Sequence, residues 1–138
     1  MDSNLRIPEK MLAEDKFSQW LGIQIENITD KECRLKMTVR DEMTNGFKVS
    51  HGGIVFSLAD SAVAFAANAH GLIAMSVDNS VHYAKAVFAN DILTASATEE
   101  SRNKKTGHYR VRITNQHNEN VALFSGTVYF TSRSHELE

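Results

Sequence analysis

Apolar and polar residues alternate in several short segments of the chain, and the period of this alternation predicts their structure. In residues 23–26 and 34–39 every second side chain is apolar and its neighbours are charged or polar. A period of two is typical of a strand that buries one face. We therefore expect two early strands, joined by a turn near Thr29-Asp30-Lys31.

The second half of the chain is almost entirely strand-like. Four segments alternate in the same way or are rich in β-branched and aromatic residues, namely 73–87, 93–98, 109–114 and 121–131. Polar turn residues occupy 104–107 and 115–120. We expect four further strands, each with one dry face.

Two segments have helical patterns instead. Residues 8–20 place apolar side chains among charged ones at helical spacing, which predicts a short amphipathic helix that Gly22 ends. Residues 54–69 contain six alanines and are apolar around the whole circumference. A helix without a wide polar face is buried, and small side chains let a curved sheet approach closely. The order of elements predicts an α+β hotdog fold, in which an antiparallel β-sheet wraps around one long central α-helix and a short N-terminal helix precedes them.

Length, composition and charge exclude several classes of protein. The 138 residues suit a single domain, residues 1–138, with its core over about 16–131. Hydrophobic residues make up 42% and charged residues 23%, which is ordinary for a globular protein. The net charge of −2 supplies no positive field for nucleic acid. We expect no signal peptide, no membrane span and a cytoplasmic location, and the single Cys33 excludes an intrachain disulfide.

One carboxylate, Asp60, lies inside the apolar helix that follows His51-Gly52-Gly53. The segments with a specific spacing around it are Asn45-Gly46, His51-Gly52-Gly53, 56–62 (FSLADSA), Asn68, Gly71-Leu72, 91–95 (DILTA), Lys105-Thr106-Gly107 and 121–124 (VALF). In these residues the chain resembles the hotdog-fold acyl-CoA thioesterases of the phenylacetic-acid-degradation type, over about residues 16–131.

This resemblance implies hydrolysis of an acyl-CoA thioester to the free acid and CoA. It favours small aryl-acyl groups, such as phenylacetyl-CoA or hydroxyphenylacetyl-CoA. It also implies a homo-oligomer built from dimers, commonly a tetramer, with no metal and no cofactor beyond the CoA of the substrate.

The chemistry of thioester hydrolysis assigns roles to Gly52 and Asp60. Negative charge develops on the carbonyl oxygen, and free backbone N–H groups at a helix N-terminus stabilise it. Gly52 stands at that end of the helix and has no side chain to keep a thioester away. A carboxylate acts as a nucleophile or as a base for water, and Asp60 is the candidate.

The spacing of these two residues predicts a shared active site. Gly52 and Asp60 are eight residues apart, which on an α-helix is about 12 Å along the axis and about 80° around it. One carbonyl group cannot touch both. We therefore expect Gly52 from one subunit to face Asp60 from another across a dimer interface.

Several neighbours have both a functional and a structural interpretation. Asp60 itself can be a structural acid paired with a backbone group. His51 is placed in the site as an orienting residue, although its ring can simply cap the helix. The resemblance makes Asn45 a thioester-orienting group, whereas its type suits a turn before Gly46. Gly53 serves close packing or substrate binding.

Four basic and two polar side chains complete the predicted site. Arg102, Lys104 and Lys105 form a compact cluster that suits the phosphates of CoA, or a solvated hairpin turn. Lys85 is placed with them, although the family it resembles usually has Arg-Pro where this chain has Lys85-Ala86. Ser61 and Asn68 lie near Asp60 on the predicted helix, where they line the substrate pocket or are buried hydrogen-bonding residues.

Other reaction classes are poorly supported. The six histidines show none of the spacings of a zinc site, and no nucleophile elbow or phosphate-binding glycine loop is present. Two rivals stay open. One is a hotdog hydratase or dehydratase that uses His51 and Asp60 on an acyl-thioester, and the other is an acyl-CoA-binding sensor without catalysis.

Overall fold

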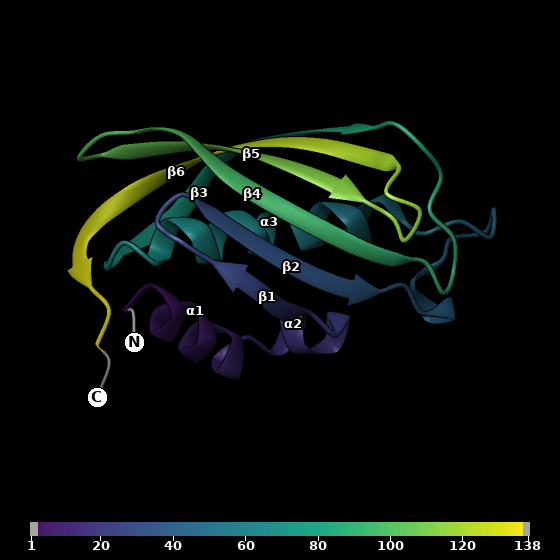
Figure 1. Ribbon diagram of the computed structural model, residues 1–138, viewed down its shortest axis with the longest axis horizontal. Coiled ribbons are helices and arrows are strands. Elements are labelled where there is room, and N and C mark those ends of the chain that lie inside the picture. Colours follow the sequence, from purple (N-terminus) through teal and green to yellow (C-terminus); the bar gives the residue numbers. More distant parts are fainter. Residues whose placement is uncertain (1–2, 137–138) are drawn as a thin grey trace.

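A six-stranded antiparallel sheet curves around one long helix in the computed structural model, which describes residues 3–136 (Figure 1). The helices are α1 (Ser3–Glu14), α2 (Lys16–Leu21) and α3 (Gly52–Asn68), with a 3₁₀ turn η1 (Asp41–Met43). The strands are β1 (Gln24–Ile28), β2 (Glu32–Thr38), β3 (Leu72–Tyr83), β4 (Ile92–Arg102), β5 (Thr106–Thr114) and β6 (Asn120–Ser134). The hotdog architecture expected from the sequence is therefore confirmed.

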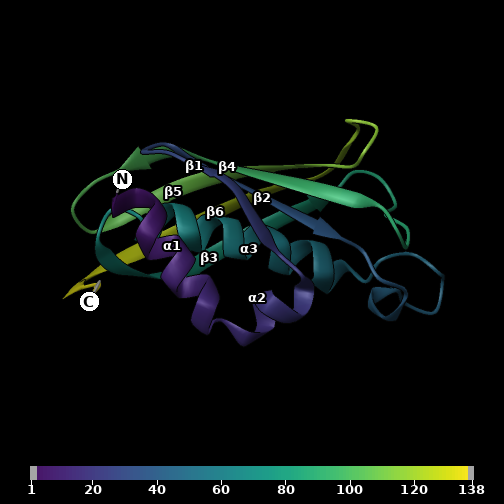
Figure 2. The same cartoon turned by 60° about the horizontal axis from the view of Figure 1, so that its bottom comes forward.

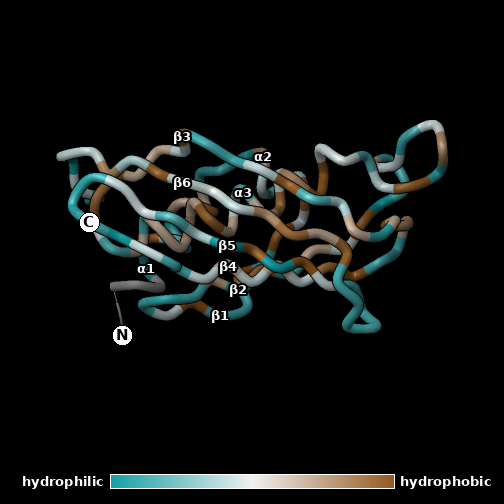
Figure 3. The backbone as a smooth tube through the Cα atoms, turned by 90° about the horizontal axis from the view of Figure 1, so that it is seen from above, coloured by the Kyte–Doolittle hydropathy of each residue, from teal (hydrophilic) through white to brown (hydrophobic). Residues whose placement is uncertain are grey.

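The strands are hydrogen-bonded in the order β1-β2-β4-β5-β6-β3. β1 and β2 pair antiparallel across the turn at 29–31, as their alternation predicts. β3 pairs with β6 on one side only, which leaves its other edge open in the single chain. In Figure 3 the turns that join β4 to β5 and β5 to β6 are hydrophilic, and the hydrophobic segments lie between them in the body of the molecule.

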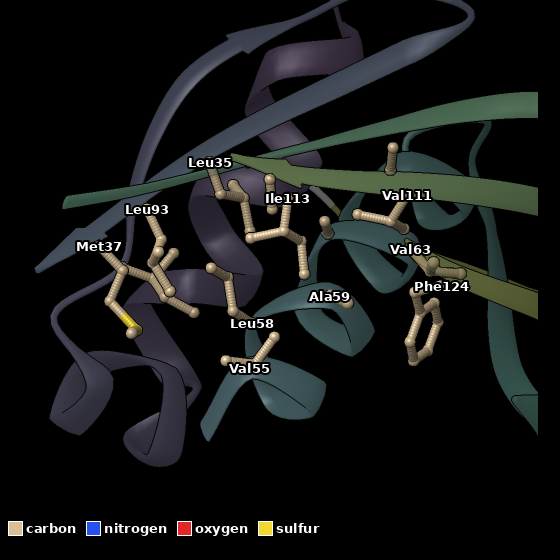
Figure 4. Packing of buried hydrophobic residues seen from close by; sticks show 14 of the residues in the cluster. Leu35, Met37, Val55, Leu58, Ala59, Val63, Leu93, Val111, Ile113 and Phe124 are labelled. Atoms are coloured by element: carbon tan, nitrogen blue, oxygen red, sulfur yellow. The ribbon is translucent and has the colours of Figure 1, made fainter. Parts of the chain in front are cut away.

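The core lies between α3 and the concave face of the sheet (Figure 4). Ala59 and Ala62 have no exposed surface, so the helix backbone packs close to the strands. Leu35 and Ile113 of the sheet point toward Leu58 of the helix, and all three are fully buried. Full burial of side chains of this size contributes about 1.5–3 kcal/mol each. The core therefore holds α3 against the concave face of the sheet.

The N-terminal segment differs from its prediction. One helix is predicted over 8–20, but the structure has two, because the chain breaks at Asp15. Asp15 has an extended backbone and caps α2, since its Oδ1 accepts the N–H of Ser18 at 2.9 Å. Gly22 ends α2 as expected, in a left-handed conformation with φ 80°. Figure 2 shows α1 and α2 along the side of α3 that the sheet leaves open.

Part of α3 is left uncovered between α2 and the edge strand β3. The residues that share this face are spaced by three or four positions and are half-buried or exposed, namely Gly53, Phe56, Ser57, Asp60 and Ala64. In this chain the central helix therefore has a fully buried side and an open side. This corrects the prediction of a helix that is buried all round.

Candidate active site

The first turn of α3 presents an unused hydrogen-bond donor. The ring of His51 caps the helix, because its Nδ1 accepts the N–H of Gly53 at 2.9 Å. The N–H of Gly52, the first residue of the helix, donates to no described residue. An unpaired N–H at a helix N-terminus carries the positive end of the helix dipole and favours an anionic oxygen.

Tyr83 at the end of β3 completes this end of the site, and no pattern in the sequence points to it. Its hydroxyl group donates a hydrogen bond of 2.8 Å to the carbonyl oxygen of Gly52. The ring also packs on the glycine, since a Cβ atom there would be 3.0 Å from the Tyr83 oxygen. A side chain at this position would therefore press on the Tyr83 ring, which must shift to accept it, and the hydrogen bond from Tyr83 fixes the carbonyl group of Gly52.

A cavity of about 330 Å³ opens beside Gly52 on the sheet side of the helix. Ser50, Tyr83 and Val87 are among its lining residues, and Lys85 lies at the same place. The Lys85 ammonium group is exposed and pairs with Glu119 at 3.0 Å. The structure thus brings Lys85 and Gly52 together, as expected from the sequence.

A second cavity of about 380 Å³ lies on the other side of the helix start. His51, Gly53 and Ser57 line it from the helix, and Phe17 and Trp20 line it from α2. The two aromatic rings are stacked, with centroids 6.0 Å apart and an angle of 15° between their planes. This aromatic cavity was not predicted, because it depends on how α2 docks against α3.

Asp60 lies two turns further along the open face of α3. Its carboxylate is half-buried and accepts no hydrogen bond from the described residues. Burial raises the pKa of Asp60, and the negative charge of Asp15 raises it further. The alternative interpretation of Asp60 as a structural acid requires a hydrogen-bond donor to this carboxylate, and none is present in residues 3–136. Asp60 lines neither cavity, which agrees with the eight-residue separation from Gly52.

Ser61 and Asn68 are both engaged within the chain. The Ser61 hydroxyl group lies 2.8 Å from that of Ser18. The Asn68 amide donates to the carbonyl of Ala64 at 2.8 Å, and its oxygen accepts the N–H of Ala74 at 2.9 Å. His135 approaches the same oxygen at 2.7 Å. Asn68 therefore ties the end of α3 to β3, and its position is structural rather than substrate-facing.

The basic cluster at 102–105 lies away from the helix start. It forms the turn between β4 and β5, at the end of the sheet opposite Gly52 (Figure 1). Arg102 pairs with the nearly buried Glu99 at 2.9 Å, whereas Lys104 and Lys105 are exposed. Within a single chain these residues therefore do not reach the start of α3. Of the predicted basic residues, Lys85 is the one that lies there.

Asn45 performs the role of a turn residue in this chain. Its side-chain oxygen accepts the N–H of Phe47 at 2.9 Å and lies 3.5 Å from the N–H of Val49. This turn carries the exposed ring of Phe47 and leads into the helix start.

Within the described chain no three His, Cys, Asp or Glu side chains come close enough to hold a metal ion. No helix in residues 3–136 is both long and apolar enough to cross a membrane.

A sheet wrapped around one helix, with a free N–H at the helix start and an unpaired carboxylate on its open face, defines a hotdog protein with the groups for thioester chemistry. The family model of the thioesterase superfamily matches residues 47–122. The chain belongs to this superfamily and is a thioester hydrolase.

Relatives with known names and structures agree with this assignment. The acyl-coenzyme A thioesterase PaaI of Escherichia coli K12 is 40% identical over 116 residues, which cover 84% of this chain and 83% of that protein. The structure of the E. coli PaaI protein, from the phenylacetic acid degradation operon, superposes with a TM-score of 0.94 at 35% identity and covers 96% of each chain. A thioesterase of Streptococcus pneumoniae TIGR4, described as hypothetical and solved with coenzyme A, has a TM-score of 0.78 at 26% identity and covers 82% of this chain and 91% of that one.

Proposed function

We propose that this protein hydrolyses acyl-CoA thioesters with a small aryl-acyl group, such as phenylacetyl or hydroxyphenylacetyl, to the free acid and CoA. The observation that carries the proposal is the unpaired N–H of Gly52 at the start of α3. That donor suits the oxyanion of a thioester, and the loss of one such donor costs on the order of 10²–10³ in rate in other enzymes. The E. coli relative is named as an acyl-CoA thioesterase, which supports the CoA ester as substrate.

The two cavities beside Gly52 suit the two arms of such a substrate. With the thioester carbonyl at the Gly52 N–H, one arm extends toward Tyr83 and Lys85 and the other toward Phe17 and Trp20. The cationic side suits the phosphates of CoA. The aromatic side suits a planar acyl group, because rings stack on Trp and Phe with about 0.5–1.5 kcal/mol beyond their burial.

A second copy of the chain supplies the carboxylate. Gly52 and Asp60 lie about 12 Å apart along one helix, so the Asp60 that acts on a thioester at Gly52 belongs to another subunit. The open edge of β3 supports such an assembly, since it exposes Met75 and Val77 at 57% and 61%. An unpaired edge with apolar side chains favours pairing with another strand.

The residues then act in a defined order. The Gly52 N–H polarises the thioester carbonyl, and Asp60 of the facing subunit either attacks the carbonyl carbon or takes a proton from the water that does. The carbon–sulfur bond of the tetrahedral intermediate breaks, and the CoA thiolate takes up a proton. Water supplies the oxygen of the released acid in both routes, directly or by hydrolysis of an anhydride.

Thiol release tests the proposal most directly. The wild type and Asp60→Ala are assayed on a panel of aryl- and alkyl-CoA thioesters, after both have been checked for folding and assembly. We expect turnover by the wild type and a loss of roughly a hundredfold or more in the variant. Binding of CoA esters without hydrolysis would favour a sensor, and hydration of an unsaturated acyl-CoA would favour a hydratase.

The acyl group is tested at Trp20, which is the only tryptophan of the chain. We expect phenylacetyl-CoA to quench its fluorescence in the Asp60→Ala variant, where the ester survives. Trp20→Leu is expected to lower kcat/KM for aryl esters roughly tenfold more than for short alkyl esters. Tyr129→Leu is the matched control, because Tyr129 is a similarly exposed aromatic residue on β6. Equal losses on both ester classes would contradict the aryl assignment.

A further inference from the structure

A hydrogen-bonded chain of side chains links α2 to the helix that carries Asp60. The hydroxyl group of Ser18 donates to Oδ2 of Asp15 at 2.7 Å, and the hydroxyl oxygens of Ser18 and Ser61 are 2.8 Å apart. Ser18 has one hydroxyl proton, which goes to the carboxylate, so Ser61 donates to Ser18. The chain therefore runs from Ser61 through Ser18 to Asp15 and ends on a negative charge.

This linkage goes beyond what a helix cap needs. A cap requires only the contact between Asp15 and the N–H of Ser18. Here the side chain of Ser18 is 1% exposed and is buried against α3, where it holds Ser61, the residue that follows Asp60. Buried polar groups are retained when each has a partner, and each hydroxyl in this chain has one. The face of α3 that carries Asp60 is thus tied to Asp15.

Asp15 is also the charged group that acts on Asp60. The Asp60 pKa is raised first by burial and then by Asp15. Among the strands that pack on α3, β3 directs the Tyr83 hydroxyl group to the start of the helix and the uncharged Asn79 toward Val63, and the other side chains packed on α3 belong to the hydrophobic core. Asp78 and His82 of β3 are exposed. The other ionisable residues on the N-terminal helices are exposed, namely Arg6, Glu9, Lys10, Glu14 and Lys16. His51 caps the start of α3, and the Glu99, His70 and Arg102 group lies at its far end.

We propose that Asp15 is a positioning residue for Asp60: through Ser18 and Ser61 it fixes the open face of the helix that carries Asp60, and its negative charge acts on that carboxylate. A neighbouring negative charge makes a carboxylate a stronger base. The catalytic consequence rests on the proposed function. A stronger base takes a proton from water more readily, provided that its carboxylate is still ionised at the working pH. The N-terminal helices of this chain then act on catalysis without touching the substrate.

The pH dependence of kcat/KM tests the effect of the Asp15 charge on Asp60. Asp15→Asn keeps a good helix cap and removes the charge, and Asp15→Ser does the same with a smaller cap. Because a like charge favours the protonated carboxyl, its removal moves the acidic limb of the profile to lower pH, by roughly half a pH unit or more. Glu14→Gln is the matched control, since it removes an exposed neighbouring carboxylate, and it should leave the limb in place.

The hydrogen-bonded link is tested separately by Ser18→Ala, which keeps the charge and the cap contact of Asp15. We expect kcat to fall several-fold while KM stays near its wild-type value, because Asp60 loses its fixed position. A merely structural Asp15 would lower the melting temperature of its variants and leave the pH profile unchanged. That result overturns the proposal, as does an equal shift in Glu14→Gln.

A readout independent of activity separates this proposal from the proposed function. Carbon-13 NMR of the aspartate carboxyl groups, with Asp60→Asn to assign the signal, follows the titration of Asp60 in the wild type and in Asp15→Asn. A lower midpoint in the variant supports the inference even if no thioester is hydrolysed. An unchanged midpoint refutes it even if the wild type is an active thioesterase.

Discussion

At the scale of single residues, the partly buried carboxylate of Asp60 reduces the stability of the fold at neutral pH. Its pKa in the folded chain is raised by burial above the ordinary value of 3.8. The cost of burying its charge is therefore absent below 3.8 and is present in full above the folded-state pKa. We expect Asp60→Asn to raise the melting temperature at pH 7 by roughly 1–3 °C, because solvent screens part of this cost.

Melting temperatures measured at a series of pH values provide the control for this prediction. The gain of Asp60→Asn should shrink as the pH falls through the folded-state pKa toward 3.8, since the wild-type carboxyl is then neutral as well. Differential scanning fluorimetry from pH 3.5 to 8 covers the range that such a shift requires. A variant that is less stable than the wild type at pH 7 would show that Asp60 has a stabilising partner in the assembly.

Gly52 is the second residue at which a single substitution tests the proposed site. A methyl group at this position would lie 3.0 Å from the Tyr83 oxygen and 3.1 Å from Cζ, so the ring must move away from the helix start. Alanine keeps the backbone N–H, but its methyl group shifts the Tyr83 ring and obstructs the approach of a thioester to that donor. We therefore expect Gly52→Ala to lower kcat on the order of a hundredfold. Gly46→Ala is the matched control, because nothing lies within 4 Å of its added Cβ. Equal activities of the two variants would exclude Gly52 from the site.

At the scale of elements, Glu99 joins four parts of the fold. Its side chain is 5% exposed and lies 3.0 Å from Lys31 before β2, 3.0 Å from His70 after α3 and 2.9 Å from Arg102 at the end of β4. Tyr109 of β5 lies 3.5 Å away. Burial opposes the charge, but the hydrogen bonds from Lys31 and Arg102 outweigh it and lower the pKa of Glu99. The network stabilises the fold, and it lies at the end of the sheet away from Gly52.

Glu99→Gln should therefore destabilise the fold by about 1–3 kcal/mol at pH 7, measured from urea unfolding. A carboxylate with a lowered pKa stabilises above its unfolded value of 4.5, and the contribution is lost as the pH falls through the folded value. The difference between the two proteins should thus narrow below about pH 4.5. Glu100→Gln, whose side chain is 35% exposed, should change the stability by less than about 0.5 kcal/mol.

At the scale of the whole molecule, subunit mixing tests whether the active site is shared. Asp60→Asn and Gly52→Ala chains are each expected to be nearly inactive. When they are unfolded and refolded together in equal amounts, about half of the dimers are mixed and each holds one intact site, so roughly a quarter of the wild-type activity should return. Activity equal to the mean of the two parents would place both groups in one chain.

The proposed assembly uses the open edge of β3 as its interface. Val77 is 61% exposed on β3, whose outer edge is unpaired in the single chain. We expect Val77→Lys to weaken the dimer, because a charge on an edge strand opposes pairing. The mass in solution, from light scattering, should fall together with the activity. An intact oligomer would place the interface elsewhere.

The sequence by itself predicted the strands and the central helix, and it proposed the two central groups of the site. Alternation with a period of two and a helix rich in alanine are local properties, so they predicted the strands and α3 without knowledge of the fold. The helix start at Gly52 and the acid at Asp60 follow from positions on one helix, and their separation follows from its geometry. The break at Asp15 was missed, because its neighbours continue the helical pattern of polar and apolar residues and only the cap on Ser18 reveals it.

The tertiary structure alone decided which distant residues meet these groups. Tyr83 reaches Gly52 across 31 positions, and Ser18 reaches Ser61 across 43. Such contacts depend on the register of β3 and on the docking of α2, which no local pattern encodes. The same long-range geometry took Arg102 to the far end of the sheet and left Lys85 beside the site. Local periodicity specifies elements, whereas the surroundings of a catalytic group depend on how those elements pack.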